Sequence, residues 1–151
     1  MTEDGLLLDT MLGKLATYLR MCGYDAVYAL DEGLEDDDAL LAWVRSEERT
    51  LLTRDERLAA RAPAAVLVES RGIEDQLAEL ADAGLDLELA AEPARCGVCN
   101  EPLERVGDDE PTPEYAPDTS EMAVWRCTDC GQHFWKGSHW DDVAETLADV
   151  S

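Results

Sequence analysis

Aspartates follow the apolar segments in the first half of the chain, at positions where carboxylates can do chemistry. Asp9 comes directly after the leucines 6–8. Asp55 closely follows the segment 50–53, and Asp37 opens the helical pattern that comes between them. Three carboxylates that meet would repel and raise each other's pKa, and a hard divalent cation such as magnesium or manganese removes that conflict. A cation held this way can activate a water and neutralise charge during cleavage of a phosphodiester bond.

A simpler explanation of these aspartates is helix capping. Aspartate is a favoured residue at a helix N-terminus, and a helical pattern follows each of Asp9, Asp37 and Asp55. Asp38 is an alternative to Asp37 as the middle acid, because both lie where that helix opens. Capping and metal binding therefore stay open for all of these positions.

Four of the five cysteines form two pairs, each with two residues between its partners. Cys96 is paired with Cys99 and Cys127 with Cys130, and 27 residues separate the two pairs. This spacing is typical of a zinc ribbon, in which four thiolates hold one ion in a closed, structural site. Two disulfides are the alternative, but disulfides are rare in intracellular proteins. A redox role for one pair would leave the other unexplained.

The elements that must position the aspartates alternate between strands and helices. An unbroken apolar run suits a strand that is buried on both faces, and apolar residues at helical spacing follow it. Strands are expected at residues 6–8, 24–30, 50–53 and 65–68, with a fifth, edge strand at 85–89. This alternation predicts an α/β fold with a mostly parallel sheet. The aspartates would then lie at its carboxyl edge, where ligands bind in such sheets.

The composition changes near Glu92-Pro93, where we place a boundary between residues 1–92 and 93–151. The second part holds both cysteine pairs, five of the six prolines and three of the four tryptophans. It is expected to form a small ribbon module with a long loop between the cysteine pairs and a last helix beginning at Trp140.

The charge balance is extreme, with 35 acidic against 12 basic residues and a net charge of −23. Because the acids are spread along the whole chain, we favour adaptation to a salt-rich cytoplasm, as in a halophile, over binding of a basic partner. The charge argues against unassisted binding of nucleic acid. No apolar run approaches a membrane span, and Met1–Asp4 lack the pattern of a signal peptide, so we expect a soluble, cytoplasmic protein.

Several sequence runs resemble the PIN-like ribonucleases, specifically the Mut-seven C-terminal ribonuclease family, in which a PIN-like domain carries a C-terminal zinc ribbon. The resemblance rests on the cysteine pattern and on the runs 7–9, 12–16, 18–20, 51–55 and 135–140. It implies a metal-dependent nuclease that acts on RNA, with Asp9 and Asp55 among its acids. The family's middle acid precedes two variable and then two aliphatic residues, which favours Asp37 over Asp38. A fourth acid has no clear match.

Three basic or aromatic side chains are candidates for contact with RNA. Lys14 and Arg54 border the expected edge, and His139 lies in the aromatic run before the last helix. Ion pairs with the abundant acids are the alternative for the two bases, and packing of the ribbon against the first part is the alternative for the aromatic run. A different class of function also stays open: a non-catalytic zinc-ribbon adaptor that binds RNA, the ribosome or a protein.

Overall fold

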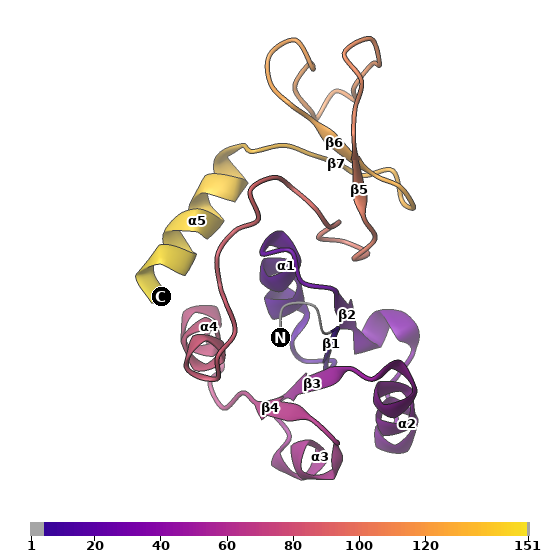
Figure 1. Ribbon diagram of the computed structural model, residues 1–151, viewed down its shortest axis with the longest axis vertical. Coiled ribbons are helices and arrows are strands. Elements are labelled where there is room, and N and C mark those ends of the chain that lie inside the picture. Colours follow the sequence, from indigo (N-terminus) through magenta and orange to yellow (C-terminus); the bar gives the residue numbers. More distant parts are fainter. Residues whose placement is uncertain (1–4, 151) are drawn as a thin grey trace.

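The structure is a computed structural model that describes residues 5–150 (Figure 1). Met1–Asp4, on which the expected lack of a signal peptide rests, lie outside the described residues, as does Ser151. A parallel sheet lies between helices on its two faces, and a small antiparallel sheet lies beyond α1 (Gly13–Met21) at the opposite end of the molecule from α3 (Glu56–Arg61).

The first part of the chain alternates strands and helices as expected. Its elements are β1 (Leu6–Leu8), α1, β2 (Ala26–Tyr28), the short 3₁₀-helix η1 (Ala29–Glu32), α2 (Asp37–Glu47), β3 (Thr50–Thr53), α3, β4 (Ala65–Leu67) and α4 (Ile73–Asp82). The second part contains β5 (Leu103–Arg105), β6 (Trp125–Cys127), β7 (His133–Phe134) and α5 (Ser138–Val150).

The larger sheet has four parallel strands in the order β2-β1-β3-β4, which confirms the expected α/β class. Alternate leucines of β1 face opposite layers. Leu6 and Leu8 pack in the core under α1 and α4, whereas Leu7 packs in the core under α2 and α3. The run of three leucines is therefore a strand that is buried on both faces.

The expected fifth strand at residues 85–89 is wrong, because this segment has no strand partner. Leu85 and Leu87 are buried in the core, and the backbone of Asp86 exchanges two hydrogen bonds with the Tyr24 hydroxyl. Alternating leucines indicate an extended chain with one buried face. They do not distinguish a strand from a connector whose polar groups bond to side chains.

The strand order places a switch point between β1 and β3. The chain passes from β1 to β2 on one side and then crosses to β3 on the other side of β1. In open α/β sheets the crevice at the carboxyl ends of two such strands is where ligands bind. Asp9 follows β1 and Asp55 follows β3, so both come to this crevice.

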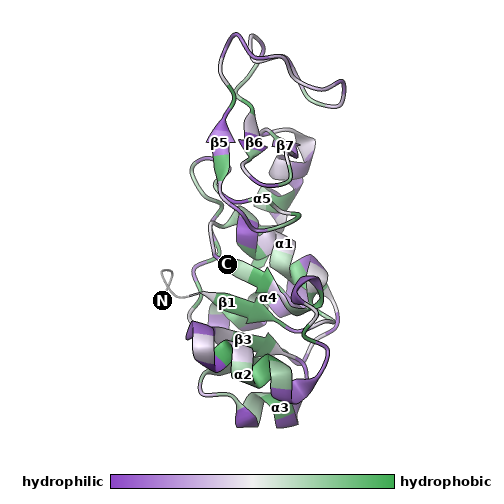
Figure 2. Cartoon of the chain, turned by 90° about the vertical axis from the view of Figure 1, so that its right-hand side faces the viewer, coloured by the Kyte–Doolittle hydropathy of each residue, from purple (hydrophilic) through white to green (hydrophobic). Residues whose placement is uncertain are grey.

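The C-terminal module consists of the antiparallel sheet β5-β6-β7 and a helix that returns to the first part. Helix α5 lies against α4, and its Val143 and Leu147 are buried in the same core as Leu8 and Leu77. In Figure 2 the strands of the parallel sheet and the helices around it carry hydrophobic residues, drawn in green, while the loop between β5 and β6 extends from the far end of the molecule.

Candidate active site and metal centre

Asp9 is the acid that the fold fixes most firmly. It is 7% exposed, and its Oδ2 accepts a hydrogen bond of 2.6 Å from the Thr53 hydroxyl. Its Oδ1 accepts a second bond, of 2.8 Å, from the N–H of Thr10. Helix α1 begins four residues later, after Leu12, which makes no side-chain cap. Asp9 is therefore held by the neighbouring strand rather than by capping the helix.

Thr53 links the two acids at the switch point. Its side chain is fully buried, and while its hydroxyl donates to Asp9, the same oxygen accepts the N–H of Asp55 at 3.0 Å. Sequence reasoning missed this residue. The available signal was a polar residue at the end of an otherwise apolar buried strand.

Asp55 is exposed and caps helix α3. The N–H groups of Arg57 and Leu58 donate to its Oδ1 at 3.0 Å and 3.2 Å. Both bonds go to one oxygen of the carboxylate. The capping role expected as an alternative is thus present, and it orients the carboxylate at the edge beside Thr53.

The middle acids lie at the start of α2. Asp36 caps this helix by accepting the N–H of Ala39, and Asp37 and Asp38 are exposed in its first turn. Asp38 pairs with Arg61 of α3 at 2.6 Å, and this hydrogen bond raises the pKa of Arg61. Among residues 5–150, Asp9, Asp37 and Asp55 do not form a cluster as tight as that of the four cysteines, whose ligand atoms all lie within 4.8 Å of one another.

Two of the candidate RNA contacts lie near this edge. Lys14 is exposed in the first turn of α1. Arg54 is half-buried between Thr53 and Asp55, and its Nε has no hydrogen-bond partner among the described residues. Arg54 therefore brings positive charge to the edge with part of its hydrogen-bonding capacity unused.

Glu79 on α4 is an acid that sequence reasoning did not select. It reaches the turn after β4, where its two oxygens accept the N–H groups of Glu69 and Ser70 at 2.9 Å and 3.0 Å. Desolvation alone would raise the pKa of Glu79, but these bonds and the charge of Arg54 hold it below its ordinary value. Its carboxylate organises the turn beside the edge.

The four cysteines predicted to bind metal come together. Their sulfurs all lie within 4.8 Å of one another, with Sγ–Sγ distances of 3.7 Å between Cys96 and Cys130 and 3.4 Å between Cys99 and Cys127. A tetrahedral zinc ion with bonds of about 2.3 Å needs sulfurs about 3.8 Å apart. All four cysteines are free rather than disulfide-bonded. The donor set and its size therefore fit a single ion such as zinc.

Backbone N–H groups of the second cysteine turn point at a sulfur. Burial alone would raise the pKa of Cys127, but the N–H groups of Asp129 and Cys130 lower it to about 7. The turns themselves need left-handed backbone, with φ of 72° at Asn100 and 79° at Gly131. The second turn therefore lowers the pKa of Cys127, whereas burial raises the pKa of Cys96 and Cys99.

Two polar side chains join the cysteine module to the parallel sheet. Arg20, 4% exposed, donates to the carbonyl of Ala26 at 2.8 Å and to that of Gly97 at 2.9 Å. Asn100 accepts the N–H of Ala26 and donates to Asp25 at 2.7 Å. Burial lowers the pKa of Arg20, and nearby Asp31 and the Cys96 and Cys99 thiolates oppose that shift. The first cysteine turn therefore covers the free edge of β2.

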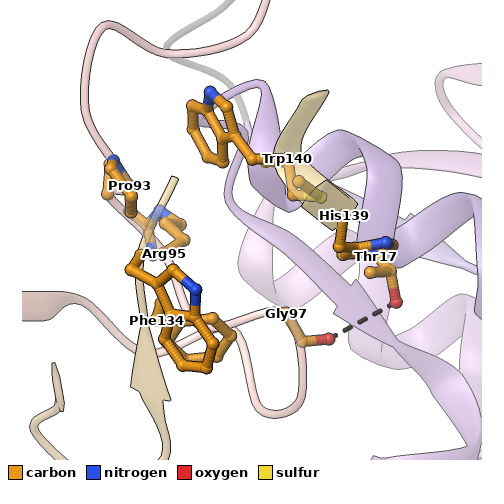
Figure 3. Close-up of a pocket in the computed structure, with 10 residues that line it drawn as sticks. Thr17, Pro93, Arg95, Gly97, Phe134, His139 and Trp140 are labelled. Atoms are coloured by element: carbon orange, nitrogen blue, oxygen red, sulfur yellow. Dashed lines mark hydrogen bonds between the residues drawn. The ribbon is translucent and has the colours of Figure 1, made fainter. Parts of the chain in front are cut away.

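His139 lies at a different place from the aspartates. It is exposed at the start of α5 and lines a pocket between α1 and the cysteine module (Figure 3). Thr17 and Phe134 line the same pocket, and the Thr17 hydroxyl donates to the carbonyl of Gly97. The candidate RNA contacts thus divide into Lys14 and Arg54 at the sheet edge and His139 at the junction of the two parts.

A parallel α/β sheet with carboxylates at its switch point, joined to a four-cysteine module, defines a protein with a candidate active edge and a separate metal-binding module. The Mut7-C RNAse domain model matches residues 4–147, nearly the whole chain, so the chain belongs to this family. The family resemblance expected from the sequence is thereby confirmed, and the family's name indicates ribonuclease-type activity. No curated protein and no solved structure matches the chain significantly. Among residues 5–150, no helix is both long enough and apolar enough to cross a membrane.

Proposed function

We propose that the protein is a metal-dependent ribonuclease that hydrolyses RNA phosphodiester bonds at the carboxyl edge of a PIN-like sheet. The observation that carries the proposal is Asp9, buried at the switch point and joined through Thr53 to the backbone of Asp55. Asp9 and Asp55 would hold magnesium or manganese, with Asp37 as the third acid. Oxygen ligands of this kind suit either cation, and magnesium commonly uses one or two carboxylates together with waters and substrate phosphates.

The chain's own residues would prepare the reaction by fixing charge. A bound divalent cation supplies an acidified water and neutralises charge on the phosphate. Thr53 holds one oxygen of Asp9 and the N–H of Thr10 holds the other, so this carboxylate keeps its direction. Asp55 is held by the first turn of α3. Lys14 and Arg54 place positive charge beside the edge, where a phosphate would lie.

We also propose that Cys96, Cys99, Cys127 and Cys130 hold one structural zinc ion. Four thiolate ligands leave no open position, so this site would stabilise the module rather than take part in cleavage. With the boundary at residues 92 and 93, a nuclease unit would precede a ribbon unit that helps to hold RNA. A cytoplasmic location would keep the thiols reduced.

Single aspartate substitutions test the catalytic assignment. Cleavage of labelled single-stranded RNA is measured with magnesium or manganese at molar KCl. Asp9→Asn and Asp55→Asn should lower the rate by more than the roughly 10- to 100-fold loss typical of residues that only orient metal ligands. Asp37→Asn should also lower it, whereas Asp38→Asn is the matched control from the same helical turn. Unchanged cleavage in both the Asp9 and Asp55 variants would refute the assignment.

The alternative is a non-catalytic adaptor that binds RNA, the ribosome or a protein through its ribbon. It is favoured by the arrangement of the acids, since Asp9, Asp37 and Asp55 form no cluster as tight as the cysteines within the described residues and Asp38 is paired with Arg61. A manganese titration separates the two functions. Binding that is lost in Asp9→Asn supports the nuclease, and absence of binding together with retained capture of a partner supports the adaptor.

A further inference from the structure

Two adjoining hollows lie where the cysteine module meets α1 and α5. The first has about 490 Å³ of empty space, its open mouth included, and is lined by Thr17 and Met21 of α1 together with residues of the module. The second has about 480 Å³ of empty space, again with its open mouth included. Phe134, Trp135 and His139 line both hollows, so the two adjoin at these side chains, and together they are called the track below.

Aromatic rings dominate this track. Phe134, Trp135 and Trp140 all line the first hollow, whose exposed lining is mostly apolar. Figure 3 shows Pro93, Arg95 and Phe134 on one side of it and Trp140, His139 and Thr17 on the other. Flat apolar walls with an open mouth suit a planar ring, and aromatic side chains are the usual platforms on which single-stranded bases stack.

A glycine leaves room for the Trp135 indole. A Cβ on Gly137 would lie 2.6 Å from the Trp135 Nε1 and 3.0 Å from its Cδ1, so only glycine admits the indole there. Tyr115, from the loop between β5 and β6, lies against the same indole with ring centroids 6.2 Å apart. Packing against Tyr115 limits the freedom of the ring beside the hollow, and a ring that is ordered in advance lowers the entropic cost of stacking.

Scarce positive charge gathers at the track. Arg95 lines the first hollow, and its guanidinium donates to the Asn100 carbonyl at 3.1 Å. Lys136 lies 5.9 Å from the ring centroid of Trp140, which lines the same hollow. In a chain with 12 basic and 35 acidic residues, two cations beside three aromatic rings favour an anionic ligand that carries planar groups.

We propose that this track binds consecutive bases of a single RNA strand, with Phe134 and Trp135 as stacking surfaces and with Arg95 and Lys136 beside the phosphates. That the bound strand is RNA rests on the proposed function. A strand held here would run along α1 toward Asp9, because α1 begins just after the candidate active edge and carries Thr17 and Met21 farther along. The track is then a substrate-holding site separate from the acids.

The test compares two strands of equal charge. Binding of a short oligoadenylate and of a ribose-phosphate strand of the same length without bases is measured by fluorescence anisotropy. The zinc-loaded full chain is used at molar KCl without magnesium or manganese. The parent should prefer the strand with bases, and Trp135→Leu should reduce that preference by about 10-fold, within the range for loss of one stacked base. Trp43→Leu, on α2, is the matched control and should keep it.

His139→Ala provides a second variant, because this exposed side chain can be removed with little risk to folding. This variant should also reduce the preference for the strand with bases over the strand without bases. Equal binding of the two strands by the parent, or an unchanged preference in both variants, would overturn the proposal. AMP that competes as well as the oligomer would overturn the binding of consecutive bases. A protein ligand that competes with the oligomer and loses binding in Trp135→Leu would also overturn it in favour of a protein-docking groove.

The binding result and the cleavage result test the two proposals separately. If Trp135→Leu and His139→Ala bind the strand with bases as the parent does while Asp9→Asn abolishes cleavage, the track proposal is refuted and the nuclease proposal is supported. If binding depends on bases and on Trp135 but no RNA is cleaved under any metal, the track stands and the nuclease falls.

Discussion

At the scale of single residues, the candidate active edge depends on a buried hydroxyl as much as on its acids. Thr53 is at the end of β3, paired in register with Leu67, and the backbone N–H of Asp9 bonds to the adjacent Leu52 carbonyl at 3.0 Å. Strands β1 and β3 therefore place Asp9 and Thr53 side by side. A carboxylate that is desolvated in this way stays in place because each of its oxygens has a donor.

We predict that Thr53→Val destabilises the protein by about 1–3 kcal/mol, because it keeps the shape of the side chain but leaves the buried oxygen of Asp9 without its donor. Denaturant unfolding of the zinc-loaded chain, without magnesium or manganese, measures the change. Thr50→Val at the other end of the same strand is the control and should change stability by less than about 0.5 kcal/mol. Equal stability of the Thr53 variant and the parent would contradict the role assigned to this hydroxyl.

At the scale of elements, the cysteine module closes an edge of the parallel sheet. Strand β2 is an edge strand, and edge strands present unpaired backbone groups. The Asn100 side chain accepts a hydrogen bond from the N–H of Ala26, and Arg20 donates one to the carbonyl of Ala26. Burial alone would raise the pKa of Asp25, but its hydrogen bonds with Arg49 and Asn100 lower it. The contact is thus a polar junction in which both backbone groups of Ala26 have partners.

We predict that Asn100→Gly opens this junction while keeping the turn. Glycine tolerates the left-handed backbone of residue 100, whose φ is 72°, so the change removes the side chain without adding strain. Losing one hydrogen bond of about 1 kcal/mol should speed amide exchange at Ala26 about fivefold, as measured by NMR hydrogen exchange.

The matched control is Glu48→Gly, at the other described non-glycine residue with positive φ, 52°. It tests the backbone effect alone and should leave exchange at Ala26 unchanged. If Ala26 exchanges at the parent rate in the Asn100 variant, the side chain does not protect the edge of β2.

At the scale of the whole molecule, the main feature that affects stability is the large negative charge. A net charge of −23 on 151 residues disfavours the compact state through self-repulsion, and only four ion pairs between side chains are present among the described residues. The pairs made by Arg61 and Arg126 are more exposed and contribute little, whereas the pair between Arg49 and Asp25 is partly buried. We therefore expect dissolved ions to be needed to screen its acids.

We predict that the midpoint of thermal unfolding rises as KCl increases from low concentration to about 1 M, where the Debye length falls from tens of ångströms to about 3 Å. Circular dichroism of the zinc-loaded chain measures the midpoint. The same concentrations of a neutral osmolyte serve as the control for effects other than screening. A midpoint that falls or stays constant with KCl would contradict adaptation to a salt-rich environment, which the sequence composition predicts.

Residue order alone determined the features that depend on near neighbours in the chain. The leucines before Asp9, the helical spacing from Leu12 to Leu19 and the two cysteine pairs are local patterns, and the fold class and the clustering of the four sulfurs followed from them. The placement of Asp9 and Asp55 at the carboxyl ends of their strands followed in the same way, since parallel strands share one edge.

Only the tertiary structure decided which distant groups meet. The strand order that puts β1 beside β3, the hydroxyl of Thr53 between two acids and the contacts of Arg20 and Asn100 with β2 join segments far apart in sequence. The same holds for the aromatic track and for residues 85–89, whose alternation predicted a strand. Periodicity reports which face of a segment is buried. Its partners are set by the packing of the whole chain, because non-local contacts leave little trace in local sequence.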